Sequence, residues 1–410
     1  MTASTFSWLD HSDRERQRML DAIDRFAEND TRDELGLGSI RDGLSELFFP
    51  GTNTIQTRAR YFLFVPWIYR ALEASTASAE NFAARARRDE LALVEALCAT
   101  GNPEGVIGAR ARAKLKRLPS NIYWLGLREW GIRRFSGSQD DYYQRVRRPE
   151  LSAPPLDDDE DVVEGSARGN WHAGLPDPPK DLLKSADLQL TREEALYLRE
   201  RVRQKQGTSL LSYLIDSKCK MEGALPWLHP AVTTLPARLS APLEHARLFS
   251  ETMHGAALLY NLQLTESLPP EGEPEHRVAA LRAELHDWCT ELAQRSDAIA
   301  HWNHNDFWAL AKRQSHVRGS TEHFVNSWWK LETWRDPELA ISSPAARALI
   351  ESRERALKGS RARLGNQRAL ERWRGAAGLS RLNYRWGVTT RFINDIHTGL
   401  AIGGEDARTA

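Results

Sequence analysis

The stretch Thr57–Glu73 reads TRARYFLFVPWIYRALE and contains nine consecutive apolar or aromatic residues, 61–69. Its apolar side chains recur at helical spacing and also fill the remaining sides, which is typical of a helix that is buried all round. Pro66 removes one backbone hydrogen bond and should kink or break this helix. Nine residues are too few to cross a bilayer, which takes about 20. The stretch therefore predicts a core helix.

Helix-start signals recur further along the chain, which has 410 residues. Thr191 and Glu194 form a T-x-x-E capping box, and Ser343 precedes Pro344, a residue that suits the first helical position. The alternation of apolar and polar residues that is typical of strands is scarce. We therefore predict an all-α or strongly α-dominated protein with many helices.

One stretch interrupts the helical pattern. Residues 149–180 are rich in Pro, Gly and Asp, with five consecutive acidic residues at 157–161. Such a composition buries too little apolar surface to order itself. We predict a linker or long loop here. It would join an N-terminal helical domain, residues 1–148, to a C-terminal helical domain with an arginine-rich end, residues 181–410.

The basic residues are unusual in kind and in placement. The formal net charge is zero, which alone argues against a nucleic-acid binder, but only 10 of the 56 basic residues are Lys. The segment from Arg110 to Arg134 contains eight basic residues and one acidic residue. The segment from Arg353 to Arg391 contains eleven basic residues and two acidic residues. Local clusters bind phosphate through counterion release, whatever the net charge. A GC-rich genome, or pairing with acidic helices of the same protein, is the alternative explanation. The predicted nucleic-acid-binding residues in these two regions are Arg110, Arg112, Lys114, Lys116, Arg117, Arg361, Arg363, Arg368, Arg372 and Arg374.

The segment LSRLNYRWGVTTRFINDI, residues 379–396, resembles a helix-turn-helix. Gly387 would supply the turn, and Ile393 and Ile396 have the spacing of anchors on a second helix. An ordinary pair of packed helices is the alternative. The residues expected to contact DNA here are Arg385, Thr389, Thr390, Arg391 and Asn394.

A histidine-based activity is a second class of function. Arg295 and His301 stand six positions apart, a spacing similar to the Arg-x(4–6)-His pattern of the HEPN ribonucleases, which are helical. In that resemblance His301 is the general base and Arg295 stabilises the phosphate. His301, His304 and Asp306 lack an identifiable further ligand, so we expect no metal.

No motif indicates a cofactor. The sequence contains no Walker A loop, no dinucleotide fingerprint before a helix and no nucleophile elbow. The three cysteines lie far apart and show no metal spacing. The N-terminus lacks the pattern of a signal peptide, and no apolar run is long enough for a membrane helix. We expect a cytoplasmic protein without a cofactor and without a membrane partner.

Four stretches resemble an uncharacterised bacterial family, domain of unknown function 6361. They are FSWLDHSDRERQRMLDAI (6–23), the segment 33–73, YWLGLREWGI (123–132) and LNYRWGVTTRFINDIHTGL (382–400). The resemblance covers essentially the whole chain. It implies a neighbourhood of helicase and phospholipase D-like nuclease genes in antiphage defence loci, and it assigns no functional residues.

The sequence thus predicts a non-catalytic nucleic-acid-binding accessory protein of a defence or DNA-processing system. Its partners would be nucleic acid, with DNA favoured, and helicase or nuclease proteins of the same locus. An HEPN-like ribonuclease that uses Arg295 and His301, and a pure scaffold whose arginines meet acidic partner surfaces, are the alternatives.

Overall fold

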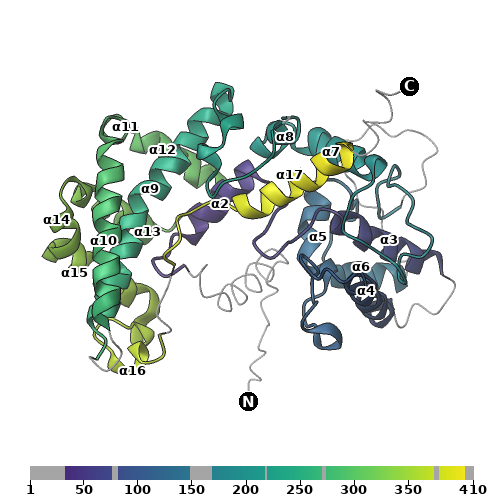
Figure 1. Ribbon diagram of the computed structural model, residues 1–410, viewed down its shortest axis with the longest axis horizontal. Coiled ribbons are helices and arrows are strands. Elements are labelled where there is room, and N and C mark those ends of the chain that lie inside the picture. The colour runs from purple at the N-terminus through teal and green to yellow at the C-terminus, as the bar shows by residue number, and fades with distance from the viewer. Residues whose placement is uncertain are drawn as a thin grey trace, which may run out of the picture. The chain divides into compact units, whose positions relative to one another are not determined.

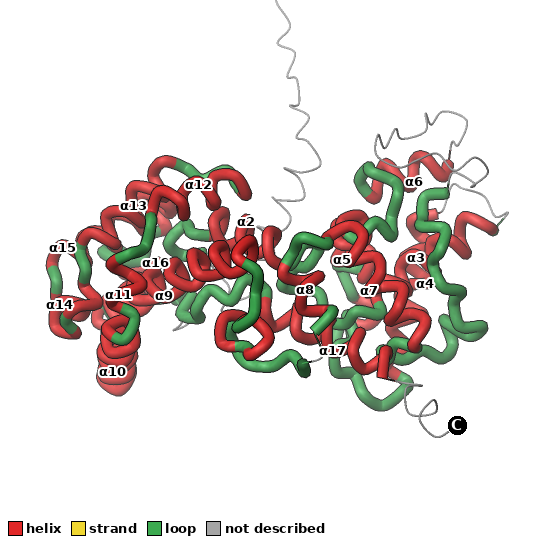
Figure 2. The backbone as a smooth tube through the Cα atoms, turned by 90° about the horizontal axis from the view of Figure 1, so that it is seen from above, coloured by secondary structure: helices red, strands yellow, loops and turns green. Residues whose placement is uncertain are grey.

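The computed structural model describes residues 33–75, 82–147, 169–217, 219–269, 274–373 and 378–401. Within these ranges the regular elements are helices, with one isolated β-bridge between Arg133 and Trp171 (Figure 2). The prediction of an all-α fold is confirmed. Among the helices described, none has the length and the apolar character that crossing a membrane requires.

The chain divides into two compact units. Unit 1 comprises the residues up to Leu44 together with Pro236–Tyr384, and unit 2 comprises Ser45–Leu235 together with the residues from Arg385 onward. The predicted boundary at 149–180 does not coincide with this division, because the residues on both sides of it belong to unit 2. Residues 148–168, which carry the acidic cluster, lie outside the described residues.

Unit 2 is built around the helix that the opening stretch predicts. Tyr61–Ala74 is helical, and all nine residues 61–69 are buried. Pro66 lies inside this helix without ending it. Phe62 stacks on Trp130 with 3.8 Å between the ring centroids, and it meets Phe392 edge to face. The helices of unit 2 (Figure 1) are α3 (Tyr61–Ala74), α4 (Phe82–Cys98), α5 (Pro119–Glu129), α6 (Gln139–Arg147), α7 (Arg192–Gln206), α8 (Leu210–Ile215) and α17 (Trp386–Ala401), with short 3-10 turns η2 (Arg112–Lys114), η4 (Pro226–Leu228) and η5 (Pro230–Val232).

Two arginines at the start of α3 are paired inside unit 2. Arg58 makes a bidentate contact with Asp395 of α17, at 2.7 Å from Nη2 and 3.0 Å from Nε. Arg60 donates to Asp187 and to Glu194, each at 2.8 Å. Glu194 also accepts from the Thr191 backbone, so the predicted capping box of α7 is confirmed. These pairs link segments that are more than a hundred residues apart.

Unit 1 is built around a helix of 30 residues, α9 (Ala237–Glu266). Helix α10 (Pro274–Ala293) packs along it, and the view in Figure 1 shows the two side by side. Gly255 makes this approach possible, since a Cβ there would lie 2.3 Å from the Trp288 ring. Ser343 caps the helix that begins at Pro344, as predicted. The remaining elements are α11 (Ser296–Ala300), α12 (His304–Gln314), α13 (Gly319–Lys330), η7 (Thr333–Arg335), α14 (Pro337–Ser342), α15 (Pro344–Lys358), η8 (Gly359–Arg361) and α16 (Gln367–Leu370); α2 (Gly38–Phe48) carries the boundary between the units.

The buried pair of Arg60 and Glu194 predicts a large loss of stability when one partner is removed. Both side chains are 5% exposed, so Arg60→Ala leaves a carboxylate buried without its cation. We expect the free energy of unfolding to fall by about 3–5 kcal/mol. Urea titration followed by circular dichroism measures it, with the exposed Arg70→Ala on the same helix as the control, expected to change stability by less than about 0.5 kcal/mol. Equal urea midpoints for the two variants would contradict the prediction.

A buried carboxylate in unit 2 predicts a pH dependence of stability. Glu90 of α4 is fully buried and accepts from the Ser120 backbone and hydroxyl at 2.8 and 2.7 Å, and burial raises its pKa from 4.5 to about 7. Because the folded state holds the Glu90 proton more tightly than the unfolded state, ionisation of Glu90 lowers the free energy of unfolding. This loss is absent below pH 4.5 and grows as the pH rises to 7. The difference in free energy of unfolding between Glu90→Gln and wild type should therefore shift by roughly 3 kcal/mol in favour of the variant between acid and neutral pH. Urea midpoints of both proteins at about pH 5 and about pH 8 measure this gain, and an unchanged difference would refute it.

Candidate functional site

The clearest exposed basic group lies in unit 2, in residues 110–117, which we call the basic loop. Arg110, Lys114 and Lys116 are exposed, and their side chains make no hydrogen bond or ion pair within the part of the chain that the structure describes. Arg112 pairs with Glu95 at 2.7 Å, and Arg117 is half-buried with internal contacts. Three of the five cations predicted here are thus open to an anion.

Helix α4 holds the basic loop in place. Arg87 donates to the carbonyls of Ala113 and Leu115, at 3.3 and 2.9 Å. Gly108 has a φ of 83°, and a Cβ there would lie 2.6 Å from the Leu115 side chain. The guanidinium of Arg87 therefore fixes the backbone on both sides of Lys114, so the basic loop has a defined conformation.

The second predicted region, at 353–391, is divided between exposed and internal arginines. In unit 1, Arg363 contacts Glu34 at 3.1 Å and the Tyr260 hydroxyl at 3.0 Å, so it is occupied. Arg374 lies outside the described residues. The arginines of this set that are exposed and make no contact with described residues are Arg361, Arg368 and Arg372.

The predicted helix-turn-helix is wrong. Residues 378–385 form no helix, and α17 begins at Trp386, so Gly387 lies in its first turn. The physical reason is the backbone of Tyr384 and Arg385, whose φ angles of 53° and 67° are incompatible with a right-handed helix.

Most of the DNA-contacting residues expected on that helix serve the fold of unit 2. Thr389 and Thr390 are buried, and Asn394 bonds both the N–H and the C=O of Met221, at 2.9 and 2.7 Å. Only Arg391 is exposed without a contact among the described residues.

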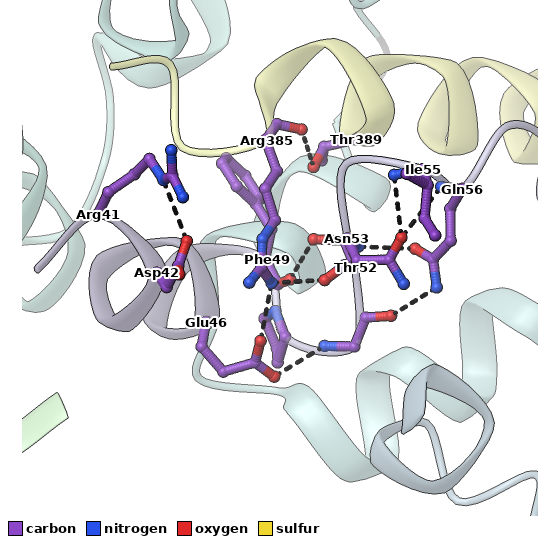
Figure 3. A network of polar contacts seen from close by, with 12 residues as sticks. Arg41, Asp42, Glu46, Phe49, Thr52, Asn53, Ile55, Gln56, Arg385 and Thr389 are labelled. Atoms are coloured by element: carbon purple, nitrogen blue, oxygen red, sulfur yellow. Dashed lines mark hydrogen bonds and ion pairs between the residues drawn. The ribbon is translucent and has the colours of Figure 1, made fainter. Parts of the chain in front are cut away.

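Arg385 organises the turn that follows α2 (Figure 3). Its guanidinium donates to Glu46 at 2.9 Å and to the carbonyl of Thr52. Glu46 also accepts from the Gly51 backbone, and Gln56 donates to the Gly51 carbonyl. Arg385 is therefore a structural residue of unit 2, and its cation is neutralised.

The Arg295 and His301 pair does not present a free cation. Arg295 contacts Glu244 and, at 3.4 Å, Glu251, so two carboxylates surround its guanidinium. His301 is exposed, with Nδ1 2.8 Å from the Asp297 carbonyl. In the described part of the chain, no three His, Cys, Asp or Glu side chains come together in a way that could hold a metal ion.

A pocket that sequence reasoning missed lies in unit 1. We call it the tryptophan pocket; its volume is about 210 Å³, and six of its twelve lining residues are aromatic, five indoles and one imidazole. They come from α10 and from the segments around α12, α13 and η7. The only signal in the sequence was the high count of 14 tryptophans. The aromatic residues that line the pocket are Trp288, Trp302, His304, Trp328, Trp329 and Trp334.

Burial lowers the pKa of one histidine that lines this pocket, His304, and of another, His245, that contacts one of its indoles. His304 lies against Trp329 with 4.3 Å between the ring centroids, and burial lowers its pKa. Burial also lowers the pKa of His245, whose Nδ1 accepts from the Trp302 indole at 2.9 Å. Both shifts favour the neutral imidazole, in which one nitrogen accepts and the other donates.

Comparison with known proteins gives one match. The model of a family described as a family of unknown function (DUF6361) matches residues 3–399. No curated protein and no solved structure matches the chain.

The new role of Asn394 predicts a stability effect and no effect on DNA binding. Asn394→Ala removes both hydrogen bonds to the Met221 backbone, so we expect the free energy of unfolding to fall by about 1–3 kcal/mol. Arg391→Ala, on the exposed side of the same helix, should change it by less than about 0.5 kcal/mol. Urea titration measures both. If Asn394→Ala kept full stability but bound DNA more weakly, the prediction would be wrong and Asn394 would belong to the DNA-binding surface.

Proposed function

We propose that this chain, which belongs to the DUF6361 family of unknown function, binds nucleic acid through the basic loop of unit 2. One observation supports the proposal above the others. Arg110, Lys114 and Lys116 are exposed on an ordered loop without an acidic partner among the described residues. Of the arginines predicted in the second region, Arg363 and Arg385 are engaged inside their own unit.

The chemistry of the basic loop suits phosphate groups. Each exposed cation that meets a phosphate releases a condensed counterion, and this gain does not depend on the net charge of the protein. Lysine offers a point charge on a long flexible stem, which follows a backbone without fixing a base. The loop presents no base-reading helix, so the expected binding is sequence-tolerant and steeply salt-dependent.

The proposed role is non-catalytic. The pair that would serve an HEPN-like reaction has its arginine engaged by Glu244 and Glu251, and this favours binding over cleavage. Service to helicase or nuclease partners in an antiphage defence system, which the family resemblance implied, extends this proposal and remains a prediction.

The salt dependence of binding tests the basic loop. We expect the chain to bind duplex and single-stranded DNA at about 50 mM salt, and each of Lys114→Ala and Lys116→Ala to lower the slope of log K against log salt by about one. Fluorescence anisotropy across a salt series measures this. Lys184→Ala, an exposed lysine elsewhere in unit 2 with no described contact, is the matched control and should leave the slope unchanged.

Two outcomes contradict the proposal. Wild type that shows no binding at about 50 mM salt removes nucleic acid as the ligand. A control variant that lowers the slope as much as Lys114→Ala removes the basic loop as the site. Absence of DNA binding combined with co-purification of an acidic partner that Lys114→Ala releases would instead establish the scaffold alternative.

A further inference from the structure

The walls of the tryptophan pocket are flat and rigidly held. Trp288 donates its indole N–H to the carbonyl of Glu251, and Trp328 donates to that of Thr252, at 2.8 and 3.0 Å. Trp329 donates to the Thr252 hydroxyl at 3.0 Å. Three indoles are thus tied to one turn of α9 by their polar atoms, so they contribute only carbon surface to the pocket.

The pocket keeps two polar groups that the fold does not use. The ring nitrogens of His304 and the indole N–H of Trp334 make no hydrogen bond with described residues. Both side chains are half-buried and line the pocket. Aromatic side chains combined with placed polar groups are typical of a small-molecule site. Here those groups include donors, so the ligand should carry acceptors.

The size of the pocket limits the ligand. An apolar cavity of about 150 Å³ holds one benzene molecule. The tryptophan pocket, at about 210 Å³, therefore has room for one ring system somewhat larger than benzene. Flat indole walls select a flat ligand, because aromatic rings gain most from stacked or edge contacts with other rings.

The charges at the rim argue against a quaternary ammonium ligand, the other class that aromatic pockets bind. The guanidinium of Arg335 already lies over the Trp334 ring, 4.8 Å from its centroid. Glu332, the carboxylate of the lining, is held by Arg335 through two hydrogen bonds of 2.8 and 2.9 Å. A second cation would meet a like charge and find no free carboxylate.

We propose that the tryptophan pocket binds one unstacked nucleobase, through ring contacts with its indoles and hydrogen bonds from His304 and Trp334. The base can come from a free nucleotide or from an unpaired position in a nucleic acid, because both present the same ring and acceptors. The inference adds a site in unit 1 to the proposed nucleic-acid binding, but it rests on residues that the basic loop does not share.

The test uses 2-aminopurine, a base whose fluorescence is quenched when it stacks on an aromatic ring. The full chain is titrated with 2-aminopurine deoxynucleoside and, separately, with a short oligothymidylate that carries one 2-aminopurine. We expect saturable quenching by wild type and at least tenfold weaker binding by Trp334→Ala and by His304→Ala. Trp334→Phe keeps a ring and lacks the N–H, so its affinity should lie between that of wild type and that of Trp334→Ala.

Controls separate the pocket from other effects. His323→Ala removes an exposed histidine of α13 outside the pocket lining and should bind like wild type. The double variant Lys114→Ala, Lys116→Ala should keep nucleoside binding while its salt slope for duplex binding falls by about two, so each proposal can fail alone. Circular dichroism melting of every variant shows that the fold is retained.

Each outcome decides the inference. Quenching of the nucleoside alone supports a free nucleotide as the ligand, and quenching of the oligonucleotide as well supports an unpaired base; both uphold the pocket. Wild type without quenching at millimolar nucleoside overturns the inference, as does equal binding by Trp334→Ala, His304→Ala and wild type. Protection of the indole fluorescence by tetramethylammonium, without nucleoside binding, overturns it in favour of a cation site.

Discussion

The fold of unit 2 depends on ion pairs, partly or fully buried, at the start of α3. Asp395 of α17 binds the Arg58 guanidinium and also accepts from the Ala59 backbone at 2.9 Å, so one carboxylate neutralises a cation and satisfies the helix start. Glu194 likewise neutralises Arg60 and accepts from the Thr191 backbone at the start of α7. Because a buried charge is costly unless it is paired, these contacts require α7 and α17 to lie against α3.

The same constraint explains why arginine is so abundant in this chain. Arg133 donates to the carbonyls of Trp124, Phe135 and Gly137, and burial lowers its pKa to about 9. Arg353 in unit 1 donates to three carbonyls and one hydroxyl. A guanidinium has five donors in a fixed fork, so it can close several loops at once, whereas an ammonium cannot. Arginine content is therefore partly a folding property, and the rare lysines are the better guide to an exposed anion site.

Local patterns predicted what local physics decides. Helical spacing identified α3 as a core helix, and the capping box at Thr191 marked the start of α7, because both depend on residues within one or two turns. The assembly of unit 2 from two distant parts of the chain depends on pairs such as Arg58 with Asp395, which no local window contains. The helix-turn-helix prediction failed for a related reason: apolar spacing does not report the positive φ at Tyr384 and Arg385.

The number of tryptophans in the sequence did not predict the tryptophan pocket, because the pocket depends on where the fold brings them together. Trp288, Trp328 and Trp329 are separated along the chain, and they converge only because one turn of α9 accepts all three indole N–H groups. Gly255, one turn further, leaves space for the Trp288 ring. A wall fixed in this way loses little side-chain entropy when a ligand enters, so the affinity is not consumed in ordering the site. The polar atoms of the pocket divide accordingly: those bonded to α9 build the wall, and those of His304 and Trp334 are left for the ligand.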